Sequence, residues 1–251
     1  MPITTEHRGA TTTLGMAMPR GNAINFAFIE AMNAALDELE RTPPGAVVLV
    51  SQGKAFCGGL DLIEAYDYDR ATLRGFVDGF EDLFLRLFTL GRPVVAAVAG
   101  HAMAGGCILA MTADVRVFAA GGWLISLNEV EIGIPFPSGA LEIARDALPP
   151  LAWADWFLEG RRFSPAEASA AQLAHALVEG APLEPALERA ARLAARPAAP
   201  QAAIKAALRA PAMARARADA DASRQRFVEA WYAPPAREKI GAVRAALLSK
   251  R

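Results

Sequence analysis

Apolar residues in the first half of the chain follow helical and strand periods in turn. From Asn22 to Arg41 they recur every three or four residues, which is the period of an amphipathic helix. The sequence Pro43-Pro44-Gly45 ends this pattern, and the short β-branched run Ala46–Val50 follows it. We therefore predict a helix over 22–41 and a buried strand over 46–50.

The same succession is repeated further along. Apolar residues in Leu73–Leu90 have helical spacing, and Pro93–Val98 is a second short apolar run. Strand, helix and strand in this order predict parallel pairing with a helix that covers the sheet. Val115–Phe118 and Trp123–Leu127 are typical of two more short strands, separated by a turn.

The composition changes after Pro149. Residues 151–251 are rich in Ala, Leu, Arg and Glu, which favour helices, and they contain aliphatic and aromatic side chains that supply packing faces. We predict a series of helices, broken at Pro165, Pro182, Pro197, Pro211 and Pro234-Pro235.

Composition and charge exclude several classes of partner. The formal net charge of the 251 residues is -1, so no broad basic field indicates a nucleic-acid partner. Charges, Gly or Pro interrupt each apolar stretch before the roughly 18 residues of a membrane span. Cys57 and Cys107 form no disulfide framework, and the N-terminus has no secretory pattern. We expect a soluble, cytoplasmic protein.

Two glycine-bearing segments follow the two apolar strands. They are 53–62 (GKAFCGGLDL) and 100–108 (GHAMAGGCI), and each can present backbone N–H groups to a ligand. Residues 107–111 are predicted to be helical, so the second segment would lie at a helix N-terminus. Such amides can form an oxyanion hole. The alternative is that these glycines only turn the chain.

Two carboxylates, Glu129 and Glu131, follow the predicted strand 123–127. Leu127, Val130 and Ile132 beside them could desolvate a carboxylate and raise its pKa toward a value useful for proton transfer. The alternative is that both are surface groups, or that one caps a turn. Spacing alone does not decide between these interpretations.

Other candidate sites have weaker support. His7, His101 and His175 have no partner at metal-ligand spacing, so we predict no metal site. Cys107, at the predicted helix start, is more typical of a small buried residue than of a nucleophile. The dinucleotide, nucleotide and serine-hydrolase motifs are absent from the sequence.

At these residues the sequence resembles the crotonase (enoyl-CoA hydratase/isomerase) superfamily. The resemblance includes AFCGGLDL, AVAGHAMAGGCILAMTADVRVF, LNEVEIGIP and FSPAEA in matching order and covers nearly the whole chain. It is most like the monofunctional Δ3,Δ2-enoyl-CoA isomerases. The implied fold is α/β, a ββα spiral over residues 1–195 followed by a helical C-terminal region over 196–251 that packs in oligomers. The implied assembly is a homotrimer or a dimer of trimers.

The resemblance also implies roles for particular residues. The backbone N–H groups of Leu60 and Gly105 would form the oxyanion hole, and Glu129 would act as acid and base. Coenzyme A is implied as part of the substrate and not as a separate cofactor. Its implied contacts are Asn22, Ala23, Ile24, Lys54, Ala55, Phe56, Gly58 and Asp61.

One departure from the family pattern bears on the reaction. Hydratases of the superfamily carry a second catalytic glutamate, and Ile108 occupies that position here. Since isoleucine can neither bind nor activate water, the sequence favours an isomerase with one glutamate. The alternatives are a hydratase or another reaction of this superfamily on a thioester, and binding of acyl-CoA without catalysis.

Overall fold

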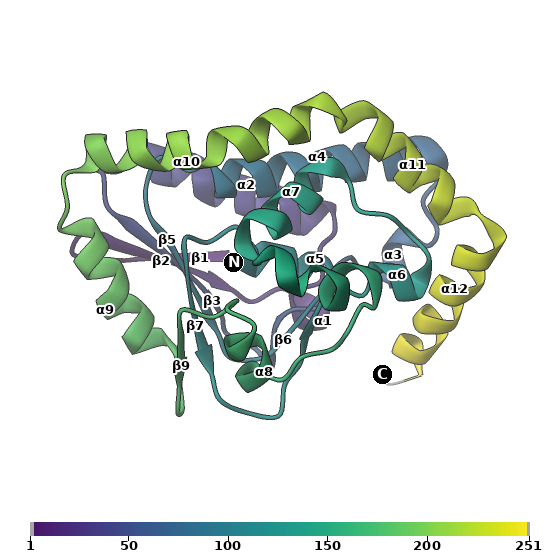
Figure 1. The fold of residues 1–251 in the computed structure, drawn as a ribbon, viewed down its shortest axis with the longest axis horizontal. Coiled ribbons are helices and arrows are strands. Elements are labelled where there is room, and N and C mark those ends of the chain that lie inside the picture. The colour runs from purple at the N-terminus through teal and green to yellow at the C-terminus, as the bar shows by residue number, and fades with distance from the viewer. Residues whose placement is uncertain (1–2, 250–251) are drawn as a thin grey trace.

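A six-stranded sheet forms the larger layer of the computed structural model, which describes residues 3–249 (Figure 1). Its strand order is β1-β2-β3-β5-β7-β9, and only β1 and β2 pair antiparallel. The strands are β1 (Ile3–Arg8), β2 (Thr11–Met16), β3 (Ala46–Ser51), β5 (Val94–Val98), β7 (Val115–Ala119) and β9 (Ala176–Val178). The predicted parallel pairing of the strands near 46–50 and 93–98 is confirmed.

The central strands of this sheet are buried on both faces, which explains their nearly continuous apolar sequences. On one face, Val47, Leu49 and Ala96 belong to the main hydrophobic core. On the other face, Val48 and Val95 pack with residues of helix α9 (Leu183–Ala194). The sheet is therefore a middle layer.

A second sheet has three short parallel strands within residues 3–249, in the order β4-β6-β8. They are β4 (Ala55–Cys57), β6 (His101–Met103) and β8 (Ile125–Ser126). No strand was predicted in the glycine-bearing segments 53–62 and 100–108, yet β4 and β6 lie within them. The strand predicted over 123–127 is regular only at Ile125–Ser126, and it joins this sheet instead of the larger one.

Helices of the first half lie close to their predicted ranges. They include α2 (Phe26–Glu40), α4 (Arg70–Phe88) and α5 (Gly105–Met111). The predicted start of α2 at Asn22 was wrong, because Asn22 has a left-handed φ of 58° and the Asn25 side chain accepts a hydrogen bond from Phe28 N. A further helix is α7 (Ser138–Ala147), and single helical turns are α1 (Pro19–Asn22), α3 (Leu62–Ala65) and α6 (Glu129–Ile132).

The second half is mostly helical, as predicted, but it also contains β9. After a 3-10 turn (Pro150–Ala152) and a π-helical turn (Ala154–Leu158), its helices are α8 (Pro165–Ala170), α9, α10 (Ala198–Ala218), α11 (Ala220–Tyr232) and α12 (Pro234–Leu248). The predicted break at Pro211 was wrong, because Pro211 lies inside α10. The helix continues past it, with Ala212 and Ala216 buried.

The last three helices form an arch over the rest of the chain (Figure 1). Helix α10 packs on α7, α11 on α4 and α7, and α12 on α3 and α6. The predicted boundary between residues 195 and 196 falls between α9 and α10, yet Phe227 and Ile240 belong to the main core. Between residues 3 and 249, no helix has the length and apolar character to cross a membrane.

Candidate active site

Three segments that are distant in the sequence leave the small sheet at one edge. Because β4, β6 and β8 are parallel, their carboxyl ends lie together. The chain continues from these ends into Leu60, Gly105 and Glu129. In α/β proteins, such an edge is a common place for ligands to bind.

The first two segments are in close contact. A Cβ atom built on Gly105 would lie 3.1 Å from Cδ1 of Leu60, and one built on Gly59 would lie 3.5 Å from the nitrogen of Gly105. Gly59 has a φ of +84°, and a Cβ there would also lie 2.7 Å from the Met103 carbonyl oxygen. Glycine at position 59 thus permits both the turn and the close approach.

The backbone amides of Leu60 and Gly105 donate no hydrogen bond to any group within residues 3–249. Leu60 is held in place by its neighbours, because Ile24 N donates to Gly59 O at 2.8 Å and Asp61 N donates to Ile24 O at 2.9 Å. Gly105 is the first residue of α5, where an amide has no partner in its own helix. The two amides are therefore fixed donors that are free to bind a ligand oxygen.

Glu129 supplies a buried carboxylate beside these amides. It is the first residue of α6 and is 7% exposed. Its Oε2 has no hydrogen-bond partner in the part of the chain that the structure describes. Burial disfavours the charged form and raises the pKa of Glu129 from the usual 4.5 to about 8. A carboxyl group with such a pKa is suited to proton transfer near neutral pH.

A cavity of about 220 Å³ contains all three groups. Apart from Asn128 and Glu129, its walls are formed by glycine, proline and apolar side chains. These walls come from the small sheet's edge and from α4, α7, α11 and α12, and their side chains include Leu62, Phe80, Ile108, Ile132, Ile134, Phe136, Ala140, Phe227, Val243 and Leu247.

The surroundings of Ile108 and Glu131 explain why neither residue adds a second carboxylate to the cavity. Ile108 is 1% exposed and lines the cavity with its hydrocarbon side chain. Glu131 is exposed and forms an ion pair with Arg162. Of the two carboxylates that the sequence offered, Glu129 alone lines the cavity.

Comparison with known proteins places this architecture in a family. The model of the family "Enoyl-CoA hydratase/isomerase" matches residues 7–239. The chain belongs to this family. The expected α/β fold with a helical C-terminal region is therefore confirmed as the crotonase fold.

Relatives within the enoyl-CoA hydratase/isomerase family carry different reaction names. A mitochondrial enoyl-CoA hydratase of Pongo abelii is 34% identical over 68% of this chain and 60% of its own length. A probable enoyl-CoA hydratase of Mycobacterium tuberculosis is 31% identical with a TM-score of 0.84, covering 90% of this chain and 96% of that one. Human mitochondrial Δ3-Δ2-enoyl-CoA isomerase is 25% identical with a TM-score of 0.92 over 100% of both chains.

The matches to the first curated relatives do not extend over their whole length. The chain spans about 60% of the length of each of them. At identities of 25–34%, family membership does not determine which of the family's reactions the chain catalyses.

Of the residues implied to contact coenzyme A, three line a groove beside the cavity. Asn22, Lys54 and Ala55 lie in this groove of about 380 Å³, together with Gly21 and other residues of the two loops. The side chain of Asn22 is used internally, because its Nδ2 donates to Phe56 O at 3.0 Å and its Oδ1 accepts from Met18 N at 2.7 Å. Lys54 is exposed and supplies the groove's positive charge.

The remaining implied contacts have other surroundings. Gly58 lines the cavity, and its amide donates to Gly21 O at 2.9 Å, so cavity and groove adjoin. Ala23, Ile24 and Phe56 are buried. Asp61 is 3% exposed, caps α3 and forms an ion pair with Arg20. These four side chains support the loops instead of facing the groove.

The surroundings of the histidines and cysteines below indicate structural roles instead of catalytic or metal-binding ones. No cluster of potential metal ligands occurs within residues 3–249. His101 Nδ1 accepts from Leu124 N, and burial lowers the pKa of His175 to about 4. Burial raises the pKa of the Cys57 thiol to about 12 and that of Cys107 well above its usual value. The prediction that Cys107 is a small buried residue is confirmed.

Asn128, for which no role was predicted, also lines the cavity. Its Oδ1 is buried without a partner, and its side chain makes no hydrogen bond within the described residues. The signal in the sequence was its place directly before Glu129. Phe80, Phe136 and Phe227 were not singled out as cavity residues; Phe80 and Phe227 lie in α4 and α11, and Phe136 lies between α6 and α7.

Proposed function

We propose that the chain is a Δ3,Δ2-enoyl-CoA isomerase. Glu129 removes a proton from C2 of a 3-enoyl thioester, which breaks the C2–H bond and gives a conjugated enolate. The amides of Leu60 and Gly105 form an oxyanion hole for the thioester oxygen as it gains negative charge. The carboxyl group returns the same proton to C4, and the double bond moves from C3–C4 to C2–C3.

The observation that carries this proposal is the single carboxylate in an apolar cavity. Moving a proton between two carbons of one acyl chain needs one group that is first a base and then an acid. The raised pKa of Glu129 suits both steps, because neither protonation state is strongly favoured near pH 8. Ile108 stands where a hydratase would need its second acidic group.

We propose that coenzyme A lies in the groove at Gly21 and Lys54, with its thioester at the adjoining cavity. This direction places the CoA phosphates near the exposed Lys54 ammonium group and the acyl chain among apolar side chains. Coenzyme A enters as part of the substrate, so the proposed reaction needs no separate cofactor.

Asn128 is the observation that favours a second candidate, hydration of a 2-enoyl thioester. Its free amide group lies in the cavity beside Glu129 and offers both a donor and an acceptor to a water molecule. Hydration would still need Glu129 as its one acid or base.

Product analysis separates the two reactions. The purified chain is incubated with trans-3-hexenoyl-CoA and, separately, with crotonyl-CoA, and products are followed by mass and ultraviolet absorbance. We expect a conjugated product of unchanged mass from the 3-enoyl substrate, with no addition of water to crotonyl-CoA.

Glu129→Gln tests the base, and Glu131→Gln is the matched control. Loss of the carboxylate should lower the isomerisation rate by about 10²- to 10⁴-fold, the usual range for general acid–base catalysis. The control removes a neighbouring exposed carboxylate and should keep full activity. Full activity in Glu129→Gln would refute the mechanism, and binding without turnover of either substrate would indicate a binding protein.

A further inference from the structure

Three helices contribute buried side chains to the wall of the cavity. Phe80 of α4, Ala140 of α7 and Phe227 of α11 are 3%, 3% and 2% exposed. Val243 and Leu247 of α12 are 37% and 42% exposed and so form the rim. We call Phe80, Ala140 and Phe227 the floor of the cavity.

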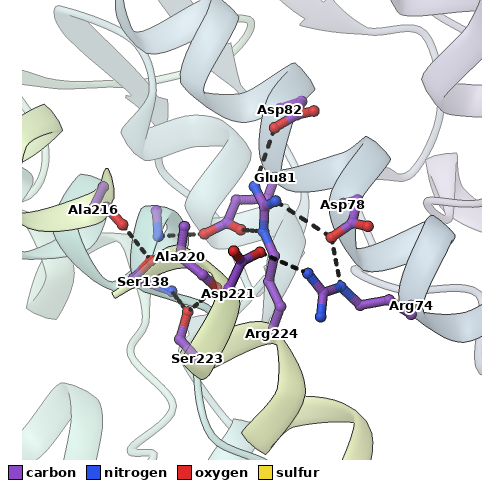
Figure 2. Close-up of polar contacts among 11 residues, drawn as sticks. Arg74, Asp78, Glu81, Asp82, Ser138, Ala216, Ala220, Asp221, Ser223 and Arg224 are labelled. Carbon is purple, nitrogen blue, oxygen red and sulfur yellow. Dashed lines mark hydrogen bonds and ion pairs between the residues drawn. The ribbon is translucent and has the colours of Figure 1, made fainter. Parts of the chain in front are cut away.

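A polar network joins the same three helices (Figure 2). The carboxylate of Glu81, on α4, accepts hydrogen bonds from Gly139 N, on α7, and from Arg224 Nε, on α11. Arg224 also pairs with Asp78 at 3.3 Å and donates to Asp82 at 3.1 Å. Figure 2 shows Arg224 reaching from α11 into this group of α4 carboxylates.

Each anchor of this network lies within three residues of a floor residue in the sequence. Glu81 follows Phe80, Gly139 precedes Ala140, and Arg224 lies three residues before Phe227 on α11. Residues three apart on a helix are neighbours on its surface. Fixing the three anchors relative to one another therefore fixes the three floor side chains.

The network is built tightly. Glu81 is 1% exposed, and a charged side chain is rarely so buried unless it is paired. A Cβ atom on Gly139 would lie 2.7 Å from Glu81 Oε1, so glycine allows the carboxylate to approach the start of α7. Ser138 N donates to Ser223 Oγ at 3.0 Å and adds a second link between α7 and α11.

We propose that Glu81 is a positioning residue that holds the cavity floor as a fixed stop for the acyl chain. The proposal rests on the proposed function and adds its substrate class, an acyl-CoA with a short unbranched hydrocarbon chain. The cavity of about 220 Å³ is smaller than the roughly 300–1,000 Å³ of pockets that enclose drug-sized ligands. Apart from Asn128 and Glu129, the side chains that line the cavity are apolar, and the remaining lining residues are glycines.

Binding of saturated thioesters tests the stop without requiring turnover. Butanoyl-, hexanoyl- and dodecanoyl-CoA are titrated into the full chain by calorimetry. A pocket without a stop would gain roughly fourfold in affinity for each further buried methylene. We expect affinity to rise from four to six carbons and to rise no further at twelve.

Glu81→Gln tests the positioning role. Glutamine still accepts from Gly139 N but loses the charge that holds Arg224, so the floor should loosen. The ratio of hexanoyl to dodecanoyl affinity should shift toward dodecanoyl by at least about tenfold, within the range for a misfit in an apolar pocket. Asp221→Asn, which removes a 95% exposed side chain at the edge of the network, should leave the ratio unchanged.

Two further variants act on the floor itself. Phe80→Ala removes floor volume without touching the network and should shift the ratio in the same direction, even if Glu81→Gln fails to fold. Ala140→Leu adds volume and should weaken hexanoyl binding more than butanoyl binding.

The outcomes distinguish this inference from the proposed function. Affinity that climbs through twelve carbons in the wild type, or equal loss for both thioesters in Glu81→Gln, would overturn the fixed stop. The expected binding profile without isomerisation would support the stop and overturn the isomerase alone.

Discussion

Glu81 and Glu129 are both buried carboxylates, but their surroundings differ. Glu81 accepts hydrogen bonds from a backbone amide and from a guanidinium group, whereas Oε2 of Glu129 has no partner within residues 3–249 and faces an apolar cavity. Burial alone therefore does not identify an acid–base group. Desolvation by burial raises the pKa of Glu129, and the missing partner leaves its carboxyl group free to exchange a proton with a ligand.

The largest expected effect comes from removing the charged partner of Glu81, which leaves its buried carboxylate unpaired, as that of Glu129 is within the described residues. Arg224→Met removes the guanidinium partner and leaves a buried charge unpaired, which should lower the free energy of unfolding by about 3–5 kcal/mol. The double variant Glu81→Leu/Arg224→Met should recover most of this loss, because it removes both charges. Urea denaturation measures both, and equal stability of Arg224→Met and wild type would show that the pairing is unimportant.

A smaller, pH-dependent effect comes from removing the ionisation of Glu129. Its pKa is about 8 in the folded chain and near 4.5 when unfolded. Between these values the folded state keeps a proton that the unfolded state has lost, so the free energy of unfolding falls as pH rises. Glu129→Gln should therefore be more stable than wild type above pH 8, on the order of a few kcal/mol, with no such gain below pH 4.5.

Denaturation at a series of pH values measures this difference. The same ionisation predicts that kcat/KM of the wild type rises with pH and levels off above about 8, because the base must be deprotonated to act. A stability difference that is constant between pH 5 and 9 would contradict the raised pKa.

The smallest expected effect tests whether stability depends on the burial of the Glu81 carboxylate or on the number of ion pairs that Arg224 forms. Asp82, which is 72% exposed, also pairs with Arg224. Asp82→Asn should change the free energy of unfolding by less than about 1 kcal/mol, the usual range for exposed pairs. A loss as large as that of Arg224→Met would mean that the whole network, and not the buried Glu81 carboxylate, carries the stabilisation.

Local patterns predicted the elements whose burial follows a simple period. The β3, α4 and β5 regions were predicted because their apolar residues follow strand or helix spacing. The hairpin of β1 and β2 was not identified, since Thr11, Thr12 and Thr13 are buried polar residues that hide a strand. The break expected at Pro211 failed because tertiary packing holds α10 together.

The candidate site likewise has parts that local sequence patterns predict and parts that depend on tertiary pairing. Sequence analysis singled out the two glycine segments and Glu129, but their meeting depends on β4, β6 and β8, which pair across long stretches of chain. No local period predicts such pairing. The floor residues were not singled out from the sequence, because their contacts with the cavity come from α4, α7 and α11 together.

The order in which the ribosome makes these parts has a consequence for the nascent protein. The amides, Glu129 and Ile108 are all synthesised before α11 and α12, which supply Phe227 and the rim of the cavity. A chain that has emerged only as far as α9 already holds the reacting groups but leaves their apolar lining open to water. Such a surface favours aggregation. The apolar lining therefore stays partly uncovered until α11 and α12 have emerged.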